Sequence, residues 1–382
     1  MTDWKTVQLQ EVATIDRDIV EASAIKGGTL YVGLENIQSG GDIVAVREVD
    51  SGELASSKFA FTPRHLLYGK LRPYLAKIAR PQFDGICSTD ILPVLLGPKL
   101  DRDYLAHLLL RPDMVALANS RATGANLPRL SPRALAELKI PLPPLPEQRR
   151  IAAVLDGAKA LRAKRRAALA QLDSLTQAIF LDLFGDPVVN PRGWPLKKFG
   201  DVGTLDRGVS KHRPRNAPHL LGGKYPLVQT GEIANCDGYI RSHKITYSDL
   251  GLRQSKMWSA GTLCITIAAN IAKTGILTFD ACFPDSVVGF RAVDPATVEF
   301  VRTWLSFLQK ALEDSAPESA QKNINLAILR NLDVPIPPIL LQRDFARRVA
   351  AVEKLKTAHR ASLAELDALF ASLQHRAFRG EL

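Results

Sequence analysis

The chain has 382 residues, of which 46% are hydrophobic, and a formal net charge of +11. This length exceeds that of one ordinary domain. No run of 18 apolar residues offers a membrane span, and the first ten residues lack the features of a signal peptide, so a cytoplasmic protein is expected. The positive charge favours a polyanionic partner, and the four cysteines form no CxxC pair, which predicts reduced, mostly buried thiols.

Residues 4–139 have the pattern of a mixed domain with short strands and a few helices. Leu30–Ile37 and Asp42–Val49 are rich in β-branched residues, and Gly40-Gly41 between them indicates a hairpin. His65–Ala79 fits a strand or a helix, although its glycine and proline argue against one continuous helix.

Apolar residues at helical spacing predict a helix over Asp101–Ser120, and Ser131-Pro132 opens a short helix that Ser131 caps. Four prolines within Pro141–Pro146 then fix an extended connector. It leads into a long amphipathic helix that begins at Glu147 and stops at Gly185-Asp186-Pro187. About 38 residues at ~1.5 Å each make a rod of roughly 55 Å, far longer than the ~11 to 12 residues of an average helix.

The segment Ile140–Phe184 returns as Val334–Phe378 at a constant shift of 194 residues. Such a shift over the whole segment indicates an internal duplication. The residues between the two copies repeat the plan of the first domain with little identity. Gly261–Leu277 is expected to be a strand pair around Asn270, and Pro295–Asp314 a helix.

The predicted fold class is α+β, with two mixed α/β domains separated by an antiparallel two-helix coiled coil and related by a pseudo-twofold duplication. Two separate helical hairpins are the alternative. The expected boundaries are 1–145 for the first domain, 146–187 for the first long helix, 188–338 for the second domain and 339–382 for the second long helix.

Both long helices carry a heptad seam that is apolar at its ends and cationic in its middle. Like charges in a seam are destabilising unless they turn outward or meet an anion. The central cations therefore either point to solvent and specify the alignment, or contact an acidic partner surface or DNA. The seam positions are Ile151, Leu155, Ala158, Arg162, Arg165, Leu169, Leu172, Thr176, Ile179 and Leu183 in the first helix, and Phe345, Val349, Val352, Lys356, His359, Leu363, Leu366, Phe370, Leu373 and Ala377 in the second.

Catalytic motifs are largely missing from the sequence. No phosphate-binding loop, GxGxxG, HExxH, GxSxG or Cys-His pattern occurs, and Asn190-Pro191-Arg192 fails the motif of amino-methylating enzymes at its third position. Pro112-Asp113 with Glu137-Leu138-Lys139 formally matches the permissive PD…ExK nuclease pattern. A structural explanation is preferred for it, because the second copy replaces the last three residues by Asn331-Leu332-Asp333.

Basic residues concentrate in two corresponding windows. Residues 54–83 contain six lysines and arginines and no carboxylate, and residues 206–258 contain nine against four acids. Such cations neutralise phosphates, and polar loop residues can read base edges, so nucleic-acid binding is predicted. The candidate DNA-contacting residues are Lys58, Arg64, Lys70, Arg72, Lys77, Arg121, Asn126 and Arg129 in the first domain, and Lys211, Arg213, Arg215, Lys244, Lys256, Asn270, Lys273, Gln321, Lys322 and Asn323 in the second.

Over essentially its whole length the chain resembles the DNA-specificity subunits of Type I restriction–modification systems. The resemblance is carried by IPLPPLPEQRRIAAVLD at 140–156, YGKLRPYLAKIA at 68–79, LFGDPVVNPRGWP at 183–195 and FRGEL at 378–382. The second copy departs from the pattern at 339–342, where it lacks the glutamate that stands at Glu147.

This resemblance implies that each half supplies one target-recognition domain for one half of a split DNA sequence, and that the paired helices fix the spacing. It also implies a chain without catalytic activity or bound cofactor, which docks methyltransferase subunits carrying S-adenosylmethionine and, through them, restriction subunits using ATP and Mg²⁺. The residues expected to serve the coiled coil or a partner contact are Glu147, Gln148, Arg162, Arg165, Leu169, Leu172, Gln342, Lys356, His359, Leu363 and Leu366. The alternatives are a nuclease or methyltransferase with its own cryptic active site, and a coiled-coil scaffold that does not bind DNA.

Overall fold

The computed structural model describes residues 4–268, 271–315 and 324–382. The chain divides into two compact units, Met1–Arg166 with Ala361–Leu382, and Ala167–Arg360. Each long helix therefore contributes residues to both units, whereas the predicted boundaries keep each helix apart from the domains. Among the described helices, none has the length and apolar content that a membrane span requires.

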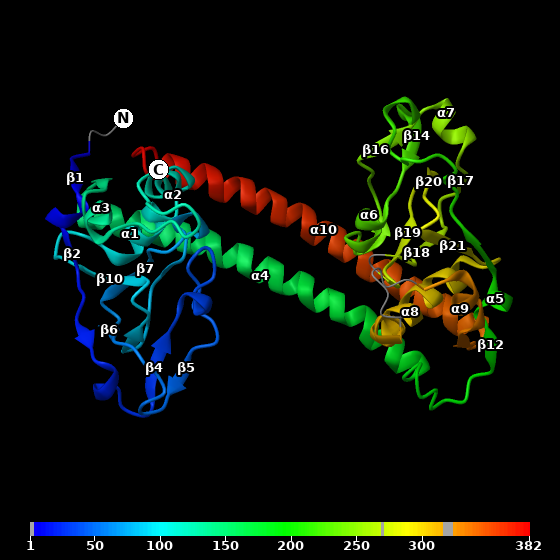
Figure 1. The fold of residues 1–382 in the computed structure, drawn as a ribbon, viewed down its shortest axis with the longest axis horizontal. Helices are drawn as coiled ribbons and strands as arrows, with labels where there is room; N and C mark the ends of the chain where they lie inside the picture. The colour runs from blue at the N-terminus through cyan, green and yellow to red at the C-terminus, as the bar shows by residue number, and fades with distance from the viewer. Residues whose placement is uncertain (1–3, 269–270, 316–323) are drawn as a thin grey trace. The chain divides into compact units, whose positions relative to one another are not determined.

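The first unit is built on an antiparallel sheet of strand order β2-β10-β7-β8 (Figure 1). Its side chains alternate between two cores. Leu66 and Leu92 pack in the core shared with the helices, while Leu67 and Ile91 pack in the core shared with a second sheet. The ambiguous segment His65–Ala79 is therefore a strand pair. The strands are β2 (Ala13–Ile15), β10 (Ile91–Leu96), β7 (His65–Gly69) and β8 (Ile78–Ala79), and the 3-10 turn between the last two is η4 (Pro73–Leu75).

The second sheet of this unit has the order β3-β6-β9-β4-β5. The predicted hairpin is present in shortened form, because β4 and β5 pair at Thr29↔Val49 and Tyr31↔Arg47, while Gly40 and Gly41 adopt positive φ between them. The strands are β3 (Ile19–Val20), β6 (Lys58–Phe61), β9 (Gly85–Cys87), β4 (Thr29–Val32) and β5 (Arg47–Val49), and the 3-10 turns are η1 (Leu9–Glu11), η2 (Ala22–Ala24) and η3 (Leu34–Asn36).

The prediction of one helix over Asp101–Ser120 is wrong. The structure has two helices, α1 (Arg102–Leu109) and α2 (Pro112–Ser120), because Arg111 is extended before Pro112, whose ring disfavours a helical residue ahead of it. The short helix after Ser131 is confirmed as α3 (Pro132–Ala136), and the Ser131 hydroxyl accepts a hydrogen bond from the Ala134 amide at 3.1 Å.

The second unit repeats this plan. Its larger sheet, β13-β21-β18-β19-β15, has the same strand order as the first unit's central sheet plus one strand. The predicted strand pair over Gly261–Leu277 is confirmed as β18 and β19, and the helix predicted over Pro295–Asp314 is confirmed as α8 (Pro295–Ser315). The strands are β13 (Thr204–Arg207), β21 (Val287–Arg291), β18 (Leu263–Thr266), β19 (Thr274–Leu277) and β15 (Gly238–Ile240).

A smaller sheet of order β16-β14-β20-β17 completes the second unit. Its β14 and β20 run parallel, as β4 and β9 do in the first unit. The remaining elements are β14 (Leu221–Leu227), β16 (Ile245–Tyr247), β17 (Met257–Trp258), β20 (Ala281–Cys282), α5 (Phe199–Val202), α6 (Thr230–Ala234), α7 (Asp249–Arg253), α9 (Leu326–Asn331) and η5 (Pro218–Leu220).

The proline connector before each long helix is held by the first strand of its own unit. In the first unit β1 (Thr6–Gln8) pairs with β11 (Lys139–Pro141), and in the second β12 (Leu196–Lys198) pairs with β22 (Asp333–Pro335). The Leu142 amide donates to the Lys5 carbonyl at 2.9 Å, and the Ile336 amide donates to the Pro195 carbonyl at the same distance. The duplication therefore extends to the register of these strand pairs.

The long helices are α4 (Leu145–Phe184) and α10 (Ile339–Ala377). The first begins two residues before the predicted Glu147, because Pro144 accepts hydrogen bonds from the amides of Glu147 and Gln148, and Pro146 lies in the first turn, where no amide hydrogen is needed. The predicted stop at Gly185 is confirmed, and its φ of +77° suits glycine.

Gln148 and Gln342 are buried at equivalent positions of the two helices. The side-chain amide of Gln148 donates to the carbonyls of Pro143 (2.7 Å) and Lys99 (3.0 Å), and its side-chain oxygen accepts from the backbone amide of Asp101 at 2.8 Å. The side-chain amide of Gln342 likewise donates to the Pro337 carbonyl at 2.8 Å, and its side-chain oxygen accepts from the Thr297 hydroxyl. Each glutamine thus joins its proline connector to the globular part of its unit.

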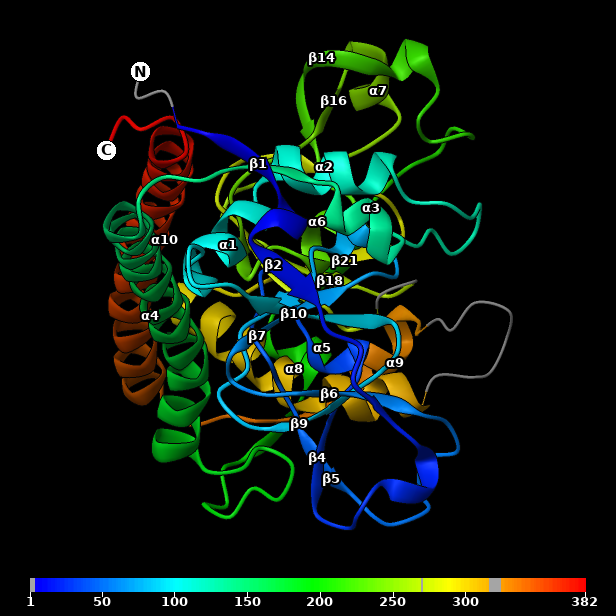
Figure 2. The same cartoon turned by 90° about the vertical axis from the view of Figure 1, so that its left-hand side faces the viewer.

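Within each unit, halves of α4 and α10 lie side by side and antiparallel (Figures 1 and 2). All twenty predicted seam positions are buried or half-buried, including Arg165 and His359. In the first unit Ile151 and Leu155 share a core with Ala377. In the second, the Phe180 and Phe345 rings lie 5.6 Å apart between centroids. The predicted seam is therefore confirmed.

The cationic centre of the seam differs from both expectations at Arg162 and Lys356, because acids of the chain itself neutralise these two cations. Arg162 Nε lies 2.5 Å from Asp367 Oδ1 in the first unit, and Lys356 Nζ lies 2.7 Å from Asp173 Oδ1 in the second. Arg162 and Lys356 are 194 residues apart, and so are Asp173 and Asp367, so the ion pair is duplicated. Arg162 also stacks over the Phe370 ring at 4.4 Å, and Lys356 has Glu353 at 3.2 Å.

The two ion pairs differ in burial, which predicts unequal costs when each is broken. Lys356 is only 4% exposed, so Asp173→Asn leaves a buried ammonium with one carboxylate and is expected to lower the free energy of unfolding by about 1 to 2 kcal/mol. Asp367→Asn is expected to cost less than about 1 kcal/mol, because the Arg162 guanidinium retains the ring of Phe370 and more solvent. Urea unfolding of the two variants makes the comparison, and equal losses would contradict it.

Candidate nucleic-acid interface

Two distant segments of the first unit meet at the end of β7. The Leu130 amide donates to the Lys70 carbonyl at 2.9 Å, and the Arg72 amide donates to the Pro128 carbonyl at 2.7 Å. The loop that carries Arg121, Asn126 and Arg129 therefore docks on the segment that carries Lys70 and Arg72. Five predicted contact residues are brought onto two adjoining segments that lie about 50 residues apart in the sequence.

We define the first basic cluster as Lys70, Arg72 and Arg129. Asp90, the residue before β10, gathers two of these cations: Arg129 Nε lies 3.3 Å from its carboxylate and Lys70 Nζ lies 4.0 Å away. The Lys70 amide also donates to the Asp90 carbonyl at 2.9 Å. Arg72 and Arg129 are exposed, and with one acid among three cations the cluster keeps a positive excess.

The other predicted residues of the first unit lie apart from these contacts. Lys58 is buried, its ammonium donates to Ser56, and desolvation lowers its pKa. Lys77 donates to the Leu34 carbonyl at 2.5 Å, and Arg64 is exposed in the turn before β7. Their contact with DNA remains a prediction, and Lys58 has the least access to a ligand.

The second unit has a denser basic cluster at the matching place. The Ile267 amide donates to the Ser286 carbonyl and the Ile324 amide donates to the Ile267 carbonyl, both at 3.0 Å. The same two hydrogen bonds occur in the first unit, from the Lys70 amide to the Asp90 carbonyl and from the Leu130 amide to the Lys70 carbonyl. Just before β21, the acid Asp285 is approached by three arginines. We define the second basic cluster as Arg207, Arg213 and Arg215 around Asp285.

The contacts of this cluster are specific. Arg207 donates twice to the Asp285 carbonyl, at 2.9 and 2.7 Å. Arg213 Nη2 lies 2.9 Å from Asp285 Oδ2, and Arg215 Nη2 lies 2.5 Å from Oδ1. Two guanidinium groups share the one carboxylate and the third donates to the backbone carbonyl of the same residue, so two of the three positive charges remain for an anionic ligand to compensate. Sequence reasoning found Arg213 and Arg215 from the charge window, but nothing in the sequence indicated that they converge on Asp285.

A cavity of about 490 Å³ opens beside the second basic cluster. Hydrogen-bonding side chains dominate its wall, and none of the residues beyond the two arginines was predicted. The polar lining residues are Arg213, Arg215, Asn216, Gln229, Thr230 and Ser286. Because several are amides and hydroxyls, the wall offers both donors and acceptors.

The remaining predicted residues of the second unit are scattered or outside the described ranges. Lys211 and Lys244 are exposed, and Lys273 is half-buried after the left-handed Ala272. Lys256 stacks over the Trp258 ring at 4.0 Å. Asn270, Gln321, Lys322 and Asn323 lie outside the described residues, and their DNA contact stays a prediction.

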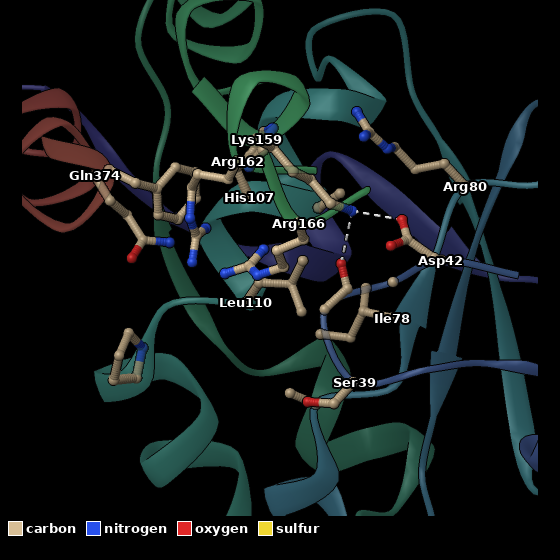
Figure 3. A pocket seen from close by; sticks show the side chains of 16 residues that line it. Ser39, Asp42, Ile78, Arg80, His107, Leu110, Lys159, Arg162, Arg166 and Gln374 are labelled. Atoms are coloured by element: carbon tan, nitrogen blue, oxygen red, sulfur yellow. Dashed lines mark hydrogen bonds and ion pairs between the residues drawn. The ribbon is translucent and has the colours of Figure 1, made fainter. Parts of the chain in front are cut away.

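A second cavity, of about 470 Å³, lies between the first unit's globular part and its helices and has a different character (Figure 3). Four cations line it, but each is matched by a carboxylate. Lys159 bonds to Asp42 at 2.7 Å and to the Gly40 carbonyl at 3.0 Å, while Arg162 and Arg166 share Asp367. We interpret this region as a joint that fastens the sheet loops to α4.

The fourth cation, Arg80, is held by two hydrogen bonds to one carboxylate of α4. It donates to both oxygens of Asp156 on α4, at 2.9 and 2.8 Å, and His107 Nε2 lies 2.9 Å from the same carboxylate. Burial by itself would raise the pKa of Asp156, but the hydrogen bonds from His107 and Arg80 outweigh it and hold the pKa well below its usual range.

This pKa shift predicts a pH-dependent contribution to stability. Asp156→Asn is expected to lower the free energy of unfolding at pH 7 by about 1 to 2 kcal/mol. Because the folded-state pKa is depressed, the contribution is present above the unfolded-state value of about 3.9 and is lost as the pH falls below it. The difference in the free energy of unfolding between wild type and variant, measured by urea unfolding, should therefore shrink from pH 7 to about pH 3.

The exposed carboxylate of Asp113, paired with the neighbouring Arg111, supplies the control. Asp113→Asn should change stability little at either pH. If Asp156→Asn lowers the free energy of unfolding as much at pH 3 as at pH 7, the role given to its carboxylate is contradicted.

The residues of the nuclease-like pattern are engaged in local ion pairs. Asp113 pairs with Arg111 at 2.6 Å, and Glu137 pairs with Arg133 at 2.8 Å. Within the part of the chain that the structure describes, no group of three or more His, Cys, Asp or Glu side chains could hold a metal. All four cysteines are free thiols and three are buried, as predicted; burial raises the pKa of Cys87 to about 12.

Comparison with known proteins gives consistent matches. The family model described as Type I restriction modification DNA specificity domain matches residues 1–171 and 191–368. The specificity subunit of the Type I restriction enzyme EcoDI from Escherichia coli is 29% identical over 192 residues, covering 48% of this chain and 41% of that protein. The EcoBI specificity subunit from Escherichia coli is 27% identical over 326 residues, covering 74% and 66%. The chain thus spans less than two thirds of either relative.

Two solved structures share the fold. One, from a study of complex assembly and conformational transition of the type I R-M system, superposes with a TM-score of 0.62 at 22% identity and covers 100% of this chain and 99% of that one. The Type I restriction–modification S subunit from M. genitalium gives a TM-score of 0.60 at 14% identity, with coverages of 98% and 96%. At these identities the likeness concerns the fold alone.

Proposed function

Because the chain belongs to the family of Type I restriction–modification DNA specificity domains, we propose that it is the DNA-reading subunit of such a system. It binds duplex DNA, reads a target split into two parts, and directs methyltransferase and restriction subunits to it. It performs no chemistry itself. S-adenosylmethionine, ATP and Mg²⁺ belong to the partner subunits, and this chain binds none of them.

One observation carries the proposal: both units place a basic cluster at the same end of matching sheets. In each, the acid that gathers the cations stands just before the strand that is second in the sheet, β10 or β21. The scaffold is alike while the cations differ in residue type and position. This is the pattern expected when two modules bind the same polyanion and read different bases on it.

The two long helices supply the spacing between the half-sites. α4 alone has 40 residues, about 60 Å at the helical rise per residue. Its first turns pack in the core of the first unit and its last turns in the core of the second. The target is therefore expected to hold two read segments separated by bases that are not read.

The helices also offer equivalent docking surfaces for two methyltransferase subunits. Leu161 and Leu355, 194 residues apart, are 53% and 51% exposed, and the equivalent Leu175 and Leu369 are 40% and 48% exposed. Arg162 follows Leu161 in α4, and it forms an ion pair with Asp367 and lies over the Phe370 ring of α10. These contacts bring Leu161 level with Leu369, the neighbour of Phe370. Leu355 and Leu175 are related in the same way in the other unit, beside Lys356 and Asp173. Two like surfaces suit two copies of one partner.

The direct test is to map modified bases genome-wide by single-molecule sequencing, in cells with and without this chain. A bipartite motif that is modified only when the chain is present supports the function. Cleavage or methyl transfer by the purified chain alone would overturn it. So would a lack of salt-dependent duplex binding by the chain together with its methyltransferase partner, measured by fluorescence anisotropy.

Lengthening both helices by one heptad at matched points, after Leu169 and Leu363, is expected to change the preferred spacer while leaving the bases of both half-sites unchanged. Seven residues add about 10 Å, close to three base-pair steps of about 3.4 Å. The modified motif of the variant, compared with that of the wild type, gives the answer. Altered half-site bases would mean that the helices do not act as the spacer.

Leu161→Glu is expected to weaken the binding of one methyltransferase subunit at least tenfold, because a leucine buried at an interface contributes about 1.5 to 3 kcal/mol. The second, equivalent surface stays intact, so the complex should retain one copy instead of two. Native mass spectrometry measures this stoichiometry. The matched control is Ala163→Glu, an exposed position away from the seam on the same helix. Retention of both copies by Leu161→Glu would refute the docking surface.

A further inference from the structure

We infer that the second unit reads its half-site through the cavity beside Asp285, with Arg215 as the residue that recognises a guanine and Asp285 as the residue that positions it. This inference rests on the proposed function, because it presumes that the second unit binds duplex DNA. It adds the residues that read bases and the base that one of them selects.

The three arginines of the second basic cluster differ in how fully the protein occupies their donors. Arg207 is held by two hydrogen bonds to the Asp285 carbonyl. Arg213 donates to the carbonyls of Ser210 and His212 and to the Asp285 carboxylate. Both guanidinium groups are thus committed to the backbone, and their structural role is to secure the loop before β21.

Arg215 is placed differently. Its Nη2 pairs with Asp285 and its Nη1 lies 3.5 Å from the Ser286 hydroxyl, at the limit of a hydrogen bond, while 40% of its side chain is exposed. It lines the cavity, and a guanidinium has five donor hydrogens. The ion pair therefore restrains the group while leaving donors for a ligand. A restrained arginine loses less conformational entropy when it binds.

The chemistry around Arg215 suits base edges better than phosphate alone. A phosphate contact needs only positive charge, which an exposed lysine provides, whereas this wall also presents Asn216, Gln229 and Thr230. Arginine pairs with O6 and N7 of guanine, and asparagine or glutamine pairs with N6 and N7 of adenine in the major groove. The wall can therefore distinguish the guanine and its neighbouring base pair.

The corresponding stretch of the first unit supports a role in sequence discrimination. The sequence TLDRGVSKHRPR at 204–215 answers TIDRDIVEASAI at 14–25, so the uncharged Ile25 occupies the place of Arg215. A general phosphate contact would be useful in both units, whereas a base-reading residue belongs to one half-site only. The second unit alone carries this arginine-rich loop.

The test uses the full chain in complex with its methyltransferase subunit and a library of duplexes with randomised half-sites. Arg215→Ala is expected to abolish the preference for guanine at one position of one half-site, a loss of about 5- to 150-fold in discrimination. Arg215→Lys keeps the positive charge without the two-pronged geometry, so it should lose the same preference while retaining affinity for non-specific duplex. Asp285→Asn should weaken the preference at the same position by a smaller factor.

Arg291→Ala is the matched control, an exposed arginine at the other end of β21, and it should leave every base preference unchanged. Unchanged preferences in Arg215→Ala and Arg215→Lys, or a uniform loss of affinity for all sequences, would overturn the inference while leaving the proposed function intact. A wild-type complex that binds duplexes without any sequence preference would overturn both. Variants that fail to co-purify with the methyltransferase subunit are replaced by Arg215→Gln, judged by the same outcomes.

Discussion

A helix of 40 residues with an apolar stripe along one side needs a partner over its full length, and the rest of the molecule depends on how that need is met. Here the partner is the chain's own second copy of the helix, so each unit contains the beginning of one helix and the end of the other. The phenylalanines at the helix ends illustrate the result. Phe184 packs against Phe345 and Phe300 in one unit, and Phe378 packs against Tyr104 in the other. Neither unit has a complete core without chain from both copies.

The repeated features of the sequence were the predictable part of this structure. The constant shift, the heptad seam and the proline connector are local patterns, and the seam residues are buried or half-buried as expected. The acids that neutralise the seam cations were missed because Asp173 and Asp367 stand one residue after a seam position, where a count of the seam alone does not include them. The break at Pro112 was missed because its flanking residues keep helical spacing across it.

The candidate site was less accessible to sequence reasoning, for a physical reason. A charge window shows that arginines are abundant, but convergence depends on which strand ends lie together. Asp285 lies more than 70 residues from Arg213 and meets it only because β21 neighbours β13 in the sheet. The same applies to Asp90 and Arg129 in the first unit. Lys58 shows the opposite error, since its charge suggested a surface residue and its ammonium is buried against Ser56.

The duplicated frame also contains an asymmetry. Lys159 and Glu353 occupy equivalent positions, 194 residues apart, yet they carry opposite charges. Lys159 holds Asp42 of the first unit's sheet loop, whereas Glu353 holds Arg241 of the second unit at 2.7 Å. If the two globular parts exchanged helices, Lys159 would lose its partner Asp42 and Glu353 would lose its partner Arg241. The charges of Lys159 and Glu353 thus distinguish the two halves of the chain, although their backbones follow one plan. The ion pairs of the folded protein therefore favour the order in which each globular part is joined to its own helix.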